Sequence, residues 1–297
     1  MSTYYRADLG VDTGGMLDAP SRAAGLQSPT RTRRYLMCRP TYFDVVYVIN
    51  PWMDPSRAVD ARRAVAQWET LRAAYGHVGH QVTTVEPAAG LPDMVFAANS
   101  ALVVDDTAYV ARFRHAERQG EEDRYAAWFA ANGFTVHRAE HVHEGEGDFA
   151  VAGDVILAAT GFRTDPAAHC EAERVFGREV VTLELVDARF YHLDTALFVL
   201  DAERVAYFPA AFSAESRALL ARRYPDAIIA TEADAEAFGC NAACDGLNVF
   251  LPTGADELAN RLAADGFEVI PVDLSEFRKA GGSVKCCTLE LRSPEEA

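Results

Sequence analysis

Residues 166–184, PAAHCEAERVFGREVVTLE, contain in one stretch the elements that decide the fold. A proline opens a segment of helical composition, Gly177 follows as the expected helix stop, and Val180–Glu184 is rich in β-branched residues. A helix that passes through a short turn into such a strand is the unit expected of an α/β protein. The stretch predicts a helix over Pro166–Phe176 and a strand after its turn.

The same order of helix, turn and strand occurs five times along the chain. The other four pairs are Ala58–Tyr75 with Gln81–Val85, Glu122–Ala131 with Phe134–His137, Ala214–Tyr224 with Ala227–Ala230, and Asp256–Ala264 with Phe267–Ile270. A strand over Arg34–Cys38 precedes them all. Because no single unit can bury its own sheet, we expect the five to pack side by side around a common centre.

Each unit is accompanied by a polar segment that leads into an apolar strand. The five segments are Pro92–Asn99, Glu144–Asp148, Phe190–Asp194, Cys240–Cys244 and Gly281–Cys286. In a ring of five units these segments would converge on one end of the centre, where loops held by a rigid scaffold can carry function. We therefore expect the functional site to be built from them.

Composition excludes several classes of protein. The 297 residues are 49% hydrophobic and 24% charged, which is typical of a globular chain. The 28 basic and 44 acidic residues give a net charge of −16, which disfavours nucleic acid and anionic membranes as partners and suits a small cationic ligand. The oligomeric state stays open, with a homo-oligomer as one alternative.

Targeting signals and paired cysteines are not evident. No apolar run reaches the length of a membrane-spanning helix, the N-terminus lacks the apolar core of a signal peptide, and the six cysteines form no CxxC pair. We expect a cytoplasmic protein with reduced thiols. Residues 1–31 are expected to form a flexible leader, and residues 32–297 a single catalytic domain.

A thiol and a distant imidazole are the candidate reactive pair. Cys286 follows Gly281-Gly282 at the expected start of a strand, so only one of Cys286 and Cys287 would face the centre. Taken alone, both are more typical of buried packing thiols. His192 and Asp194 would share a strand face, which places a carboxylate beside the imidazole. A cysteine with a histidine far away in sequence suits nucleophilic catalysis.

Three carboxylates form the next candidate element. Glu144, Glu146 and Asp148 alternate along the chain, so in extended conformation they would point the same way and require a cation. His141 and His143 make a metal conceivable, but further ligands at recognisable spacing are missing, and a solvated acidic loop is the simpler alternative. We expect no metal and no cofactor.

Together these residues resemble the guanidino-group-modifying superfamily of arginine deiminases, dimethylarginine dimethylaminohydrolases, arginine dihydrolases and amidinotransferases. The resemblance lies in the ordered segments Pro92–Asn99, Glu144–Asp148, Phe190–Asp194 and Gly281–Leu291. Met37–Pro40 with Ile49–Met53 resembles the hydrolase branch of arginine dihydrolases and bacterial dimethylargininases. The resemblance implies an α/β fold, namely a five-bladed pseudo-symmetric propeller (pentein) of ββαβ units.

The resemblance also implies roles for particular residues. Catalytic roles fall on Cys286 as nucleophile, His192 as acid and base, and Glu146, preferred over Glu144, as the guanidinium-binding acid. Substrate-binding roles fall on Asn99, Asp148, Asp194, Glu144, Asn50 and Arg118, the first four around the guanidinium and the last two at the amino-acid end.

Asn99 stands where arginine deiminases carry aspartate, which is a similarity to arginine dihydrolases. Ser100 stands where these relatives often have glycine.

The implied reaction is hydrolysis of the guanidino group of arginine or N-methylated arginine through a covalent S-alkylthiouronium. One alternative is an amidinotransferase that moves the amidino group to an amine. Another is a non-catalytic arginine-binding sensor, which the presence of both Cys286 and His192 disfavours. A metal-dependent hydrolase lacks its ligand motifs.

Overall fold

The computed structural model describes residues 32–292, so the expected leader at 1–31 lies outside the described part. The strands are β1 Arg34–Cys38, β2 Gln81–Val85, β3 Ala101–Val104, β4 Thr107–Val110, β5 Thr135–Arg138, β6 Phe149–Ala152, β7 Val155–Thr160, β8 Glu179–Glu184, β9 Leu197–Val199, β10 Val205–Tyr207, β11 Ile228–Ile229, β12 Ala243–Cys244, β13 Asn248–Pro252, β14 Glu268–Val272 and β15 Leu289–Glu290. The α-helices are α1 Ala61–His77, α2 Ala116–Gln119, α3 Glu122–Ala131, α4 Pro166–Phe176, α5 Ala214–Arg223, α6 Glu232–Glu236 and α7 Asp256–Ala264. The 3₁₀ helices are η1 Pro92–Val95, η2 Ala97–Ser100, η3 Gly145–Gly147, η4 Ala188–Phe190, η5 Leu193–Thr195, η6 Pro209–Ala211 and η7 Phe277–Ala280.

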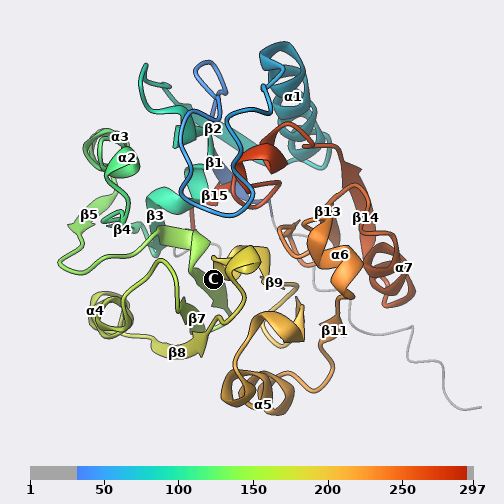
Figure 1. Ribbon diagram of the computed structural model, residues 1–297. Coiled ribbons are helices and arrows are strands. Elements are labelled where there is room, and N and C mark those ends of the chain that lie inside the picture. Colours follow the sequence, from blue (N-terminus) through green and yellow to red (C-terminus); the bar gives the residue numbers. More distant parts are fainter. Residues whose placement is uncertain (1–31, 293–297) are drawn as a thin grey trace, which may run out of the picture.

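The strands form five three-stranded sheets of one design. Their orders are β15-β1-β2, β3-β4-β5, β6-β7-β8, β9-β10-β11 and β12-β13-β14. In each sheet the first two strands pair antiparallel and the last two parallel. Helices fill the crossovers between the parallel strands, because a parallel connection must return over the sheet. Figure 1 shows these helices, α1, α3, α4, α5 and α7, around the outside of the molecule.

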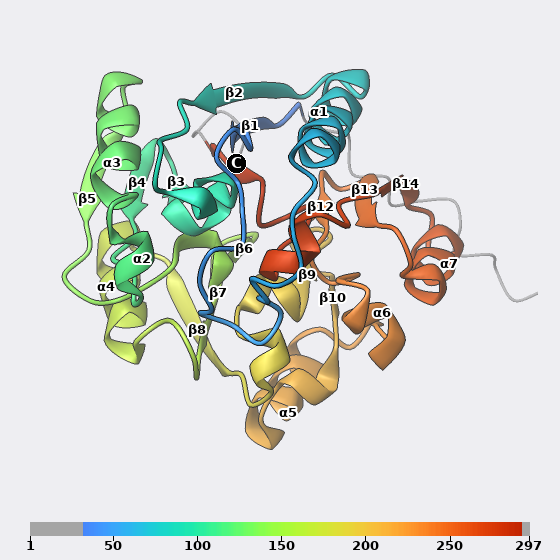
Figure 2. The same ribbon diagram turned by 45° about the horizontal axis from the view of Figure 1, so that its top comes forward.

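The two ends of the described chain meet in one sheet. Strand β15, from the C-terminal end, pairs antiparallel with β1, and β1 pairs in parallel with β2. Figure 2 shows β1 and β2 on the side of the molecule that α1 covers. The first sheet therefore joins the beginning and the end of the described chain.

Local sequence signals explain where the helices begin and end. The helix expected from Ala58 begins at Ala61 instead, because the Asp60 side chain accepts hydrogen bonds from the backbone N–H groups of Arg62 and Arg63. Helix α4 has the predicted bounds, and Gly177 follows it in the left-handed conformation. All five predicted pairs of helix and strand are present, with ends displaced by a few residues.

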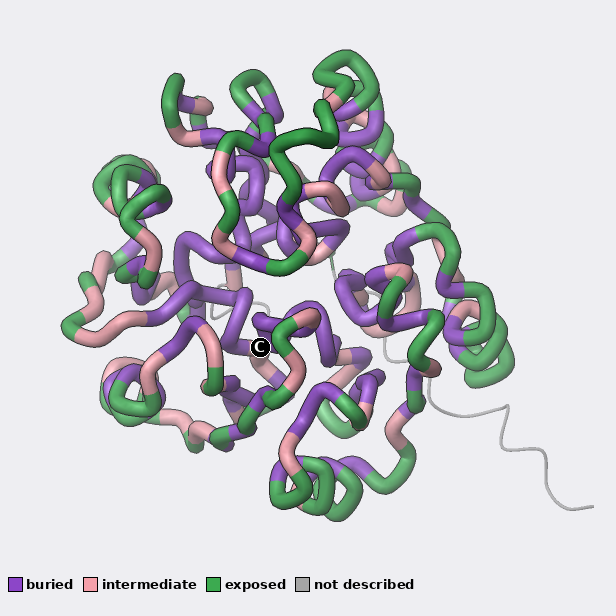
Figure 3. The backbone as a smooth tube through the Cα atoms, viewed as in Figure 1, coloured by how far each residue is buried: buried purple, intermediate pink, exposed green. Residues whose placement is uncertain are grey.

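The apolar faces point inward from both sheets and helices. Figure 3 shows buried chain through the centre and exposed chain on the outer helix faces. The largest fully buried side chains include Trp68, Tyr75 and Tyr125, which lie on the inner faces of α1 and α3. None of the helices in residues 32–292 combines the length and the apolar character needed to cross a membrane.

The polar segments precede the first strand of each sheet, as predicted. They form 3₁₀ turns before β3, β6 and β9, and irregular turns before β12 and β15. Two expectations about local geometry were wrong. Cys286 and Cys287 lie in a turn before β15, and His192 and Asp194 lie at and within η5, so neither pair shares a strand. The alternation of side chains along a strand therefore does not apply to either pair.

Candidate active site

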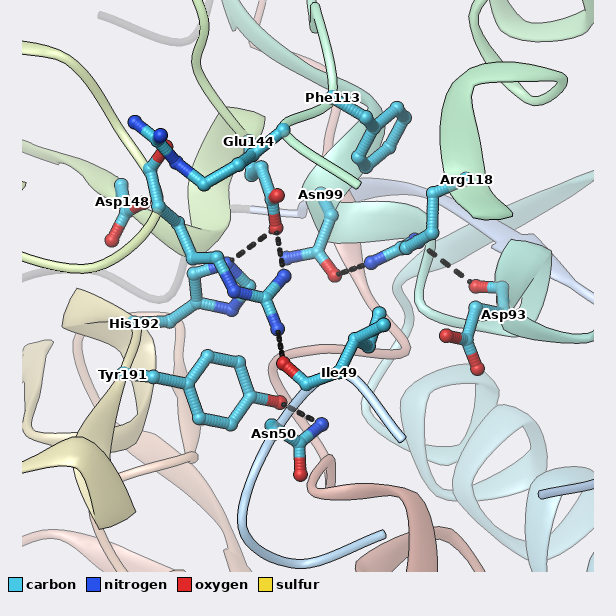
Figure 4. A network of polar contacts seen from close by, with 12 residues as sticks. Ile49, Asn50, Asp93, Asn99, Phe113, Arg118, Glu144, Asp148, Tyr191 and His192 are labelled. Atoms are coloured by element: carbon cyan, nitrogen blue, oxygen red, sulfur yellow. Dashed lines mark hydrogen bonds and ion pairs between the residues drawn. The ribbon is translucent and has the colours of Figure 1, made fainter. Parts of the chain in front are cut away.

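Side chains from three of the five polar segments and from the loop after β1 meet at a small, nearly closed cavity. Its lining residues are Ile49, Asn50, Asp93, Phe96, Asn99, Arg118, Arg163, Tyr191, His192, Ala280, Gly281 and Cys286. Cys286 and His192 therefore share one cavity although 94 residues of sequence separate them. Figure 4 shows the polar network around it, with Asn50 and Tyr191 on one side and Asn99 and Arg118 on the other.

Cys286 is held by two polar side chains. Its thiol lies 3.1 Å from Asp194 Oδ2, to which the S–H donates, and Asn241 Nδ2 donates to the sulfur at 3.1 Å. Asn241 Oδ1 also accepts the backbone N–H of Cys286 at 3.1 Å. Burial and the neighbouring Asp194 raise the pKa of the Cys286 thiol well above its usual value. Cys286 is therefore a neutral thiol in this structure.

Asn241 is a residue that sequence reasoning missed. It lies in the predicted polar segment Cys240–Cys244, whose place in the five-unit pattern was the available signal. It reaches Cys286 and also donates to the backbone oxygen of Asp194 at 3.0 Å, so it connects the segments that carry the thiol and its acid.

Gly281 allows the chain before Cys286 to approach two other segments closely. It adopts φ +84°, and a Cβ there would lie 2.8 Å from the Asn50 side chain and 2.9 Å from the Tyr191 hydroxyl. The Tyr191 hydroxyl donates to the Gly281 carbonyl at 2.8 Å and accepts a hydrogen bond from Asn50 Nδ2 at 3.2 Å. A side chain at this position would push the segments apart.

His192 is oriented by a buried carboxylate. Its Nε2 lies 2.8 Å from Glu144 Oε2, which also accepts from Arg163 at 2.7 Å. The Arg163 guanidinium stacks 4.6 Å from the Tyr191 ring and donates to the Ile49 carbonyl at 2.8 Å. Burial alone would raise the pKa of Glu144, but Arg163 and His192 hold it well below its ordinary range. Glu144 is therefore a permanent anion beside the imidazole.

The geometry around His192 favours Glu144 over Glu146, which the resemblance placed first. The 3₁₀ turn η3 replaces the expected extended chain, so the two carboxylates diverge. Glu146 pairs with Lys285 at 2.5 Å and with Arg292, and these three residues line a second cavity that Asp194 also lines but Cys286 does not. Glu144, not Glu146, is the acid in contact with His192. Arg163, which lines the cavity of Cys286, is another residue that no sequence motif marked.

Asp148 supports the site from behind. It accepts from the Thr164 hydroxyl at 2.7 Å and from the backbone N–H of Leu193 at 3.1 Å. Burial raises its pKa to about 6. Asp148 thus fixes the backbone next to His192 and does not line the cavity.

Five buried polar atoms in or next to the cavity have no hydrogen-bond partner in the structure. They are Asp93 Oδ1, Asn99 Nδ2, Glu144 Oε1, His192 Nδ1 and Asp194 Oδ1. Three are carboxylate oxygens, which can only accept when they are ionised. Unpaired buried acceptors are costly, so their concentration here fits a ligand with several N–H donors and positive charge. No group of three or more metal-binding side chains occurs within residues 32–292.

Comparison with known proteins assigns the chain to a family. The model of a family described as "N,N dimethylarginine dimethylhydrolase, eukaryotic" matches residues 48–293. The chain belongs to this family. A dimethylarginine dimethylaminohydrolase of Mycobacterium tuberculosis is 52% identical over 280 residues, which cover 93% of each chain. The bifunctional arginine dihydrolase/ornithine cyclodeaminase ArgZ of Synechocystis is 41% identical over 88% of this chain and 38% of its own length.

Solved structures of relatives agree with the family assignment. The N-terminal domain of ArgZ matches with a TM-score of 0.85 at 40% identity, over 88% of this chain and 98% of that chain. One such structure holds a covalently bound reaction intermediate in an asparagine-to-serine variant, and another holds substrate in a cysteine-to-serine variant. A dimethylarginine dimethylaminohydrolase adduct, 21% identical with a TM-score of 0.71, shares the fold.

Proposed function

We propose that the protein is an arginine dihydrolase, which hydrolyses the guanidino group of L-arginine twice and leaves ornithine. Its family membership makes it a cysteine-dependent hydrolase of the guanidino group of arginine or N-methylated arginine. The choice of two steps rests on one observation, which is that Asn99 lines the cavity beside His192 and presents an unpaired N–H donor. An amide donor suits the neutral ureido product of a first hydrolysis better than a carboxylate would.

Binding of the guanidinium activates the thiol in the proposed reaction. Ionised carboxylates recognise a planar guanidinium with several charge-assisted hydrogen bonds, and Glu144 and Asp194 each have an oxygen free for this purpose. A cation beside Cys286 lowers the cost of ionising the sulfur, and Asp194 accepts the thiol proton across the 3.1 Å contact. The substrate thus generates the thiolate that attacks it.

Two displacements complete the first hydrolysis. The thiolate adds to the guanidinium carbon, and His192 protonates the leaving amine, so that ammonia departs and an S-alkylthiouronium remains. His192 then takes a proton from water, whose oxygen adds to the same carbon and expels the sulfur as a ureido group forms. A second cycle on the ureido group releases ammonia and a carbamate, which decomposes to carbon dioxide and leaves ornithine.

The amino-acid end of the substrate has complementary charges in the cavity. Asp93 has an unpaired carboxylate oxygen that suits an ammonium group, and Arg163 offers a guanidinium that suits a carboxylate. Asn50 lies beside them, with its amide hydrogen-bonded to Tyr191 and the Ala280 carbonyl. We assign these residues to substrate recognition, together with Arg118 through its contact with Asn99.

Dimethylargininase activity is the second candidate, because the relative that is 52% identical carries that name. Incubation of the pure enzyme with L-arginine and with asymmetric dimethylarginine separates the two. Ornithine from arginine is the expected result. If the enzyme forms citrulline from dimethylarginine and leaves arginine unchanged, dimethylargininase activity replaces the proposal. An amidinotransferase would need an added amine for turnover, and an arginine sensor would bind without turnover.

We also propose that the five sheets close into a five-bladed pseudo-symmetric propeller and that residues 32–297 form one catalytic domain. The pairing of β15 with β1 supports closure, since it places both ends of the described chain in one sheet. The six cysteines, all in the described part, are unpaired, which is consistent with a reducing cytoplasm. Small-angle scattering of the full chain with a compact, single-body profile would support the domain assignment.

A further inference from the structure

We propose that Glu121 is a positioning residue for the second hydrolytic step. Through Arg118 it holds the Asn99 amide with its NH₂ group towards the reacting carbon, where that group donates to the ureido oxygen. The inference rests on the proposed two-step function. Neither the sequence motifs nor the cavity lining includes Glu121.

Glu121 and Arg118 form a buried, two-pronged ion pair. Arg118 Nε and Nη2 donate to the two carboxylate oxygens of Glu121 at 2.9 and 2.8 Å. Glu121 is fully buried and Arg118 is 3% exposed. Bidentate pairing fixes the plane of the guanidinium as well as its position. Glu121 lies between α2 and α3, so it anchors Arg118 to the framework outside the cavity.

The guanidinium in turn fixes the orientation of Asn99. Arg118 Nη1 donates to Asn99 Oδ1 at 2.7 Å, and Nη2 donates to the Asp93 carbonyl at 3.1 Å. Because a guanidinium can only donate, the amide oxygen must face Arg118 and the amide nitrogen must face away. Figure 4 shows Asn99 in this orientation between Arg118 and Glu144.

The free end of the amide lies beside the catalytic imidazole. Asn99 Nδ2 is buried without a partner, and a Cβ on Gly147 would lie 2.4 Å from it and 3.3 Å from the His192 ring. The backbone N–H of Ala98 donates to the Cys286 carbonyl at 3.0 Å, which ties the Asn99 segment to the nucleophile. The unpaired N–H therefore faces the space that the thiol and the imidazole share.

An N–H donor at this point distinguishes the two substrates. Every nitrogen of a substrate guanidinium carries hydrogen, and its lone pair is delocalised over the group. The guanidinium therefore offers no acceptor to the N–H group of Asn99 Nδ2. The ureido group carries an oxygen on the same carbon, and negative charge develops on that oxygen when the thiolate adds. A donor fixed towards this oxygen helps the second step and leaves the first largely unaffected. Loss of the anchor would let the amide rotate and turn its oxygen to the ureido oxygen.

The test compares Glu121→Gln with the matched control Glu171→Gln. Glu171 is equally buried, but its partners are the His137 side chain and the backbone N–H groups of Glu140 and His141, none of which lines the cavity. With L-arginine as substrate, Glu121→Gln is expected to release at least about 10-fold more citrulline per ornithine than wild type, a smaller effect than the roughly 10²–10³-fold cost of removing such a donor outright. Glu171→Gln is expected to leave that product ratio unchanged. Equal slowing of both steps by Glu121→Gln would overturn the inference.

Affinity separates this inference from the proposed function. In the Cys286→Ser background, Glu121→Gln is expected to weaken L-citrulline binding about 10-fold and L-arginine binding less than 3-fold, measured by calorimetry. Equal weakening of both ligands, or no citrulline binding in the parent variant, would overturn the role of Glu121. If wild type forms no ornithine from L-arginine but Glu121→Gln still weakens citrulline binding more than arginine binding, only the two-step function is overturned. If Glu121→Gln does not fold, Glu121→Asp, which keeps the charge but shortens the reach, is measured against the same criteria.

Discussion

Glu144 and Glu146 are two residues apart and both buried, yet the structure gives them different tasks. Replacing either by glutamine removes one negative charge from a buried ion-pair cluster. In Glu144→Gln the Arg163 guanidinium, 3% exposed, loses its anionic partner. In Glu146→Gln the same happens to Lys285, while Arg292 keeps only its pair with Glu290. Uncompensated buried charge costs about 3–5 kcal/mol, so both variants should lose stability, and at about 3 °C per kcal/mol each Tm should fall by roughly 10 °C.

Turnover should separate the two variants. Glu144→Gln also removes the carboxylate 2.8 Å from His192 Nε2, so the imidazole loses its orientation and its charge partner. General acid–base catalysis contributes about 10²–10⁴-fold, and kcat for ammonia release should fall within that range. Glu146→Gln should retain kcat within about 3-fold, because its partners lie outside the cavity of Cys286. The assay is ammonia release from L-arginine at a temperature where both variants are folded by circular dichroism.

The opposite ranking would refute this reasoning. If Glu146→Gln loses turnover while Glu144→Gln keeps it, the assignment of the acid from the structure is wrong and the first preference from sequence is right. If both lose turnover equally at equal folded fraction, the second cavity belongs to the active site.

Three further predictions concern the thiol, its acid and the turn beneath the imidazole. Cys286→Ser should lose at least roughly 10³-fold in turnover and still bind L-arginine, whereas Cys287→Ser, whose side chain lies in the apolar core, should keep turnover; intact-protein mass spectrometry with substrate should show an adduct on the peptide of Cys286 in wild type. Burial raises the pKa of Asp194 to about 7 from about 4 in the unfolded chain, so the native state binds more protons between these values and loses stability as pH rises through them. Urea unfolding should therefore show that Asp194→Asn stabilises the protein by about 2 kcal/mol more at pH 8 than at pH 5. An equal stability difference between variant and wild type at both pH values would show that Asp194 is already ionised at pH 5. Gly147→Ala places a Cβ 2.4 Å from Asn99 Nδ2 and should lower kcat about 10²-fold. The control Gly76→Ala has open space around its Cβ and should keep kcat and raise Tm slightly. Similar kcat values in the two variants would contradict the close packing of Gly147 and Asn99.

The fivefold pattern could be predicted because it is local. Each helix and strand depends on caps, glycine stops and apolar spacing within about twenty residues, and these were visible at Pro166–Glu184 as in the other four units. The polar segments could be placed for the same reason, since each precedes the first strand of its sheet. Resemblance then assigned Cys286 and His192 to one site.

The details of the site could not be predicted in the same way. A strand-like alternation was assumed for Glu144 and Glu146 and for His192 and Asp194, but these residues lie at or in 3₁₀ turns, where side chains do not alternate by two. Asn241 and Arg163 carry no motif, and only packing of distant segments brings them to Cys286 and Glu144.

The amino-acid sequence alone determined the repeated α/β units and the acidic character suited to a cationic ligand, and through the family resemblance it marked the thiol and imidazole proposed for the reaction. These depend on composition and on interactions between near neighbours in the chain. Only the tertiary structure decided which carboxylate hydrogen-bonds to His192, which side-chain amide hydrogen-bonds to Cys286 and which way the Asn99 amide is oriented. Each of those depends on the direction of a side chain in a turn and on atoms contributed by another sheet, and short-range sequence patterns contain neither.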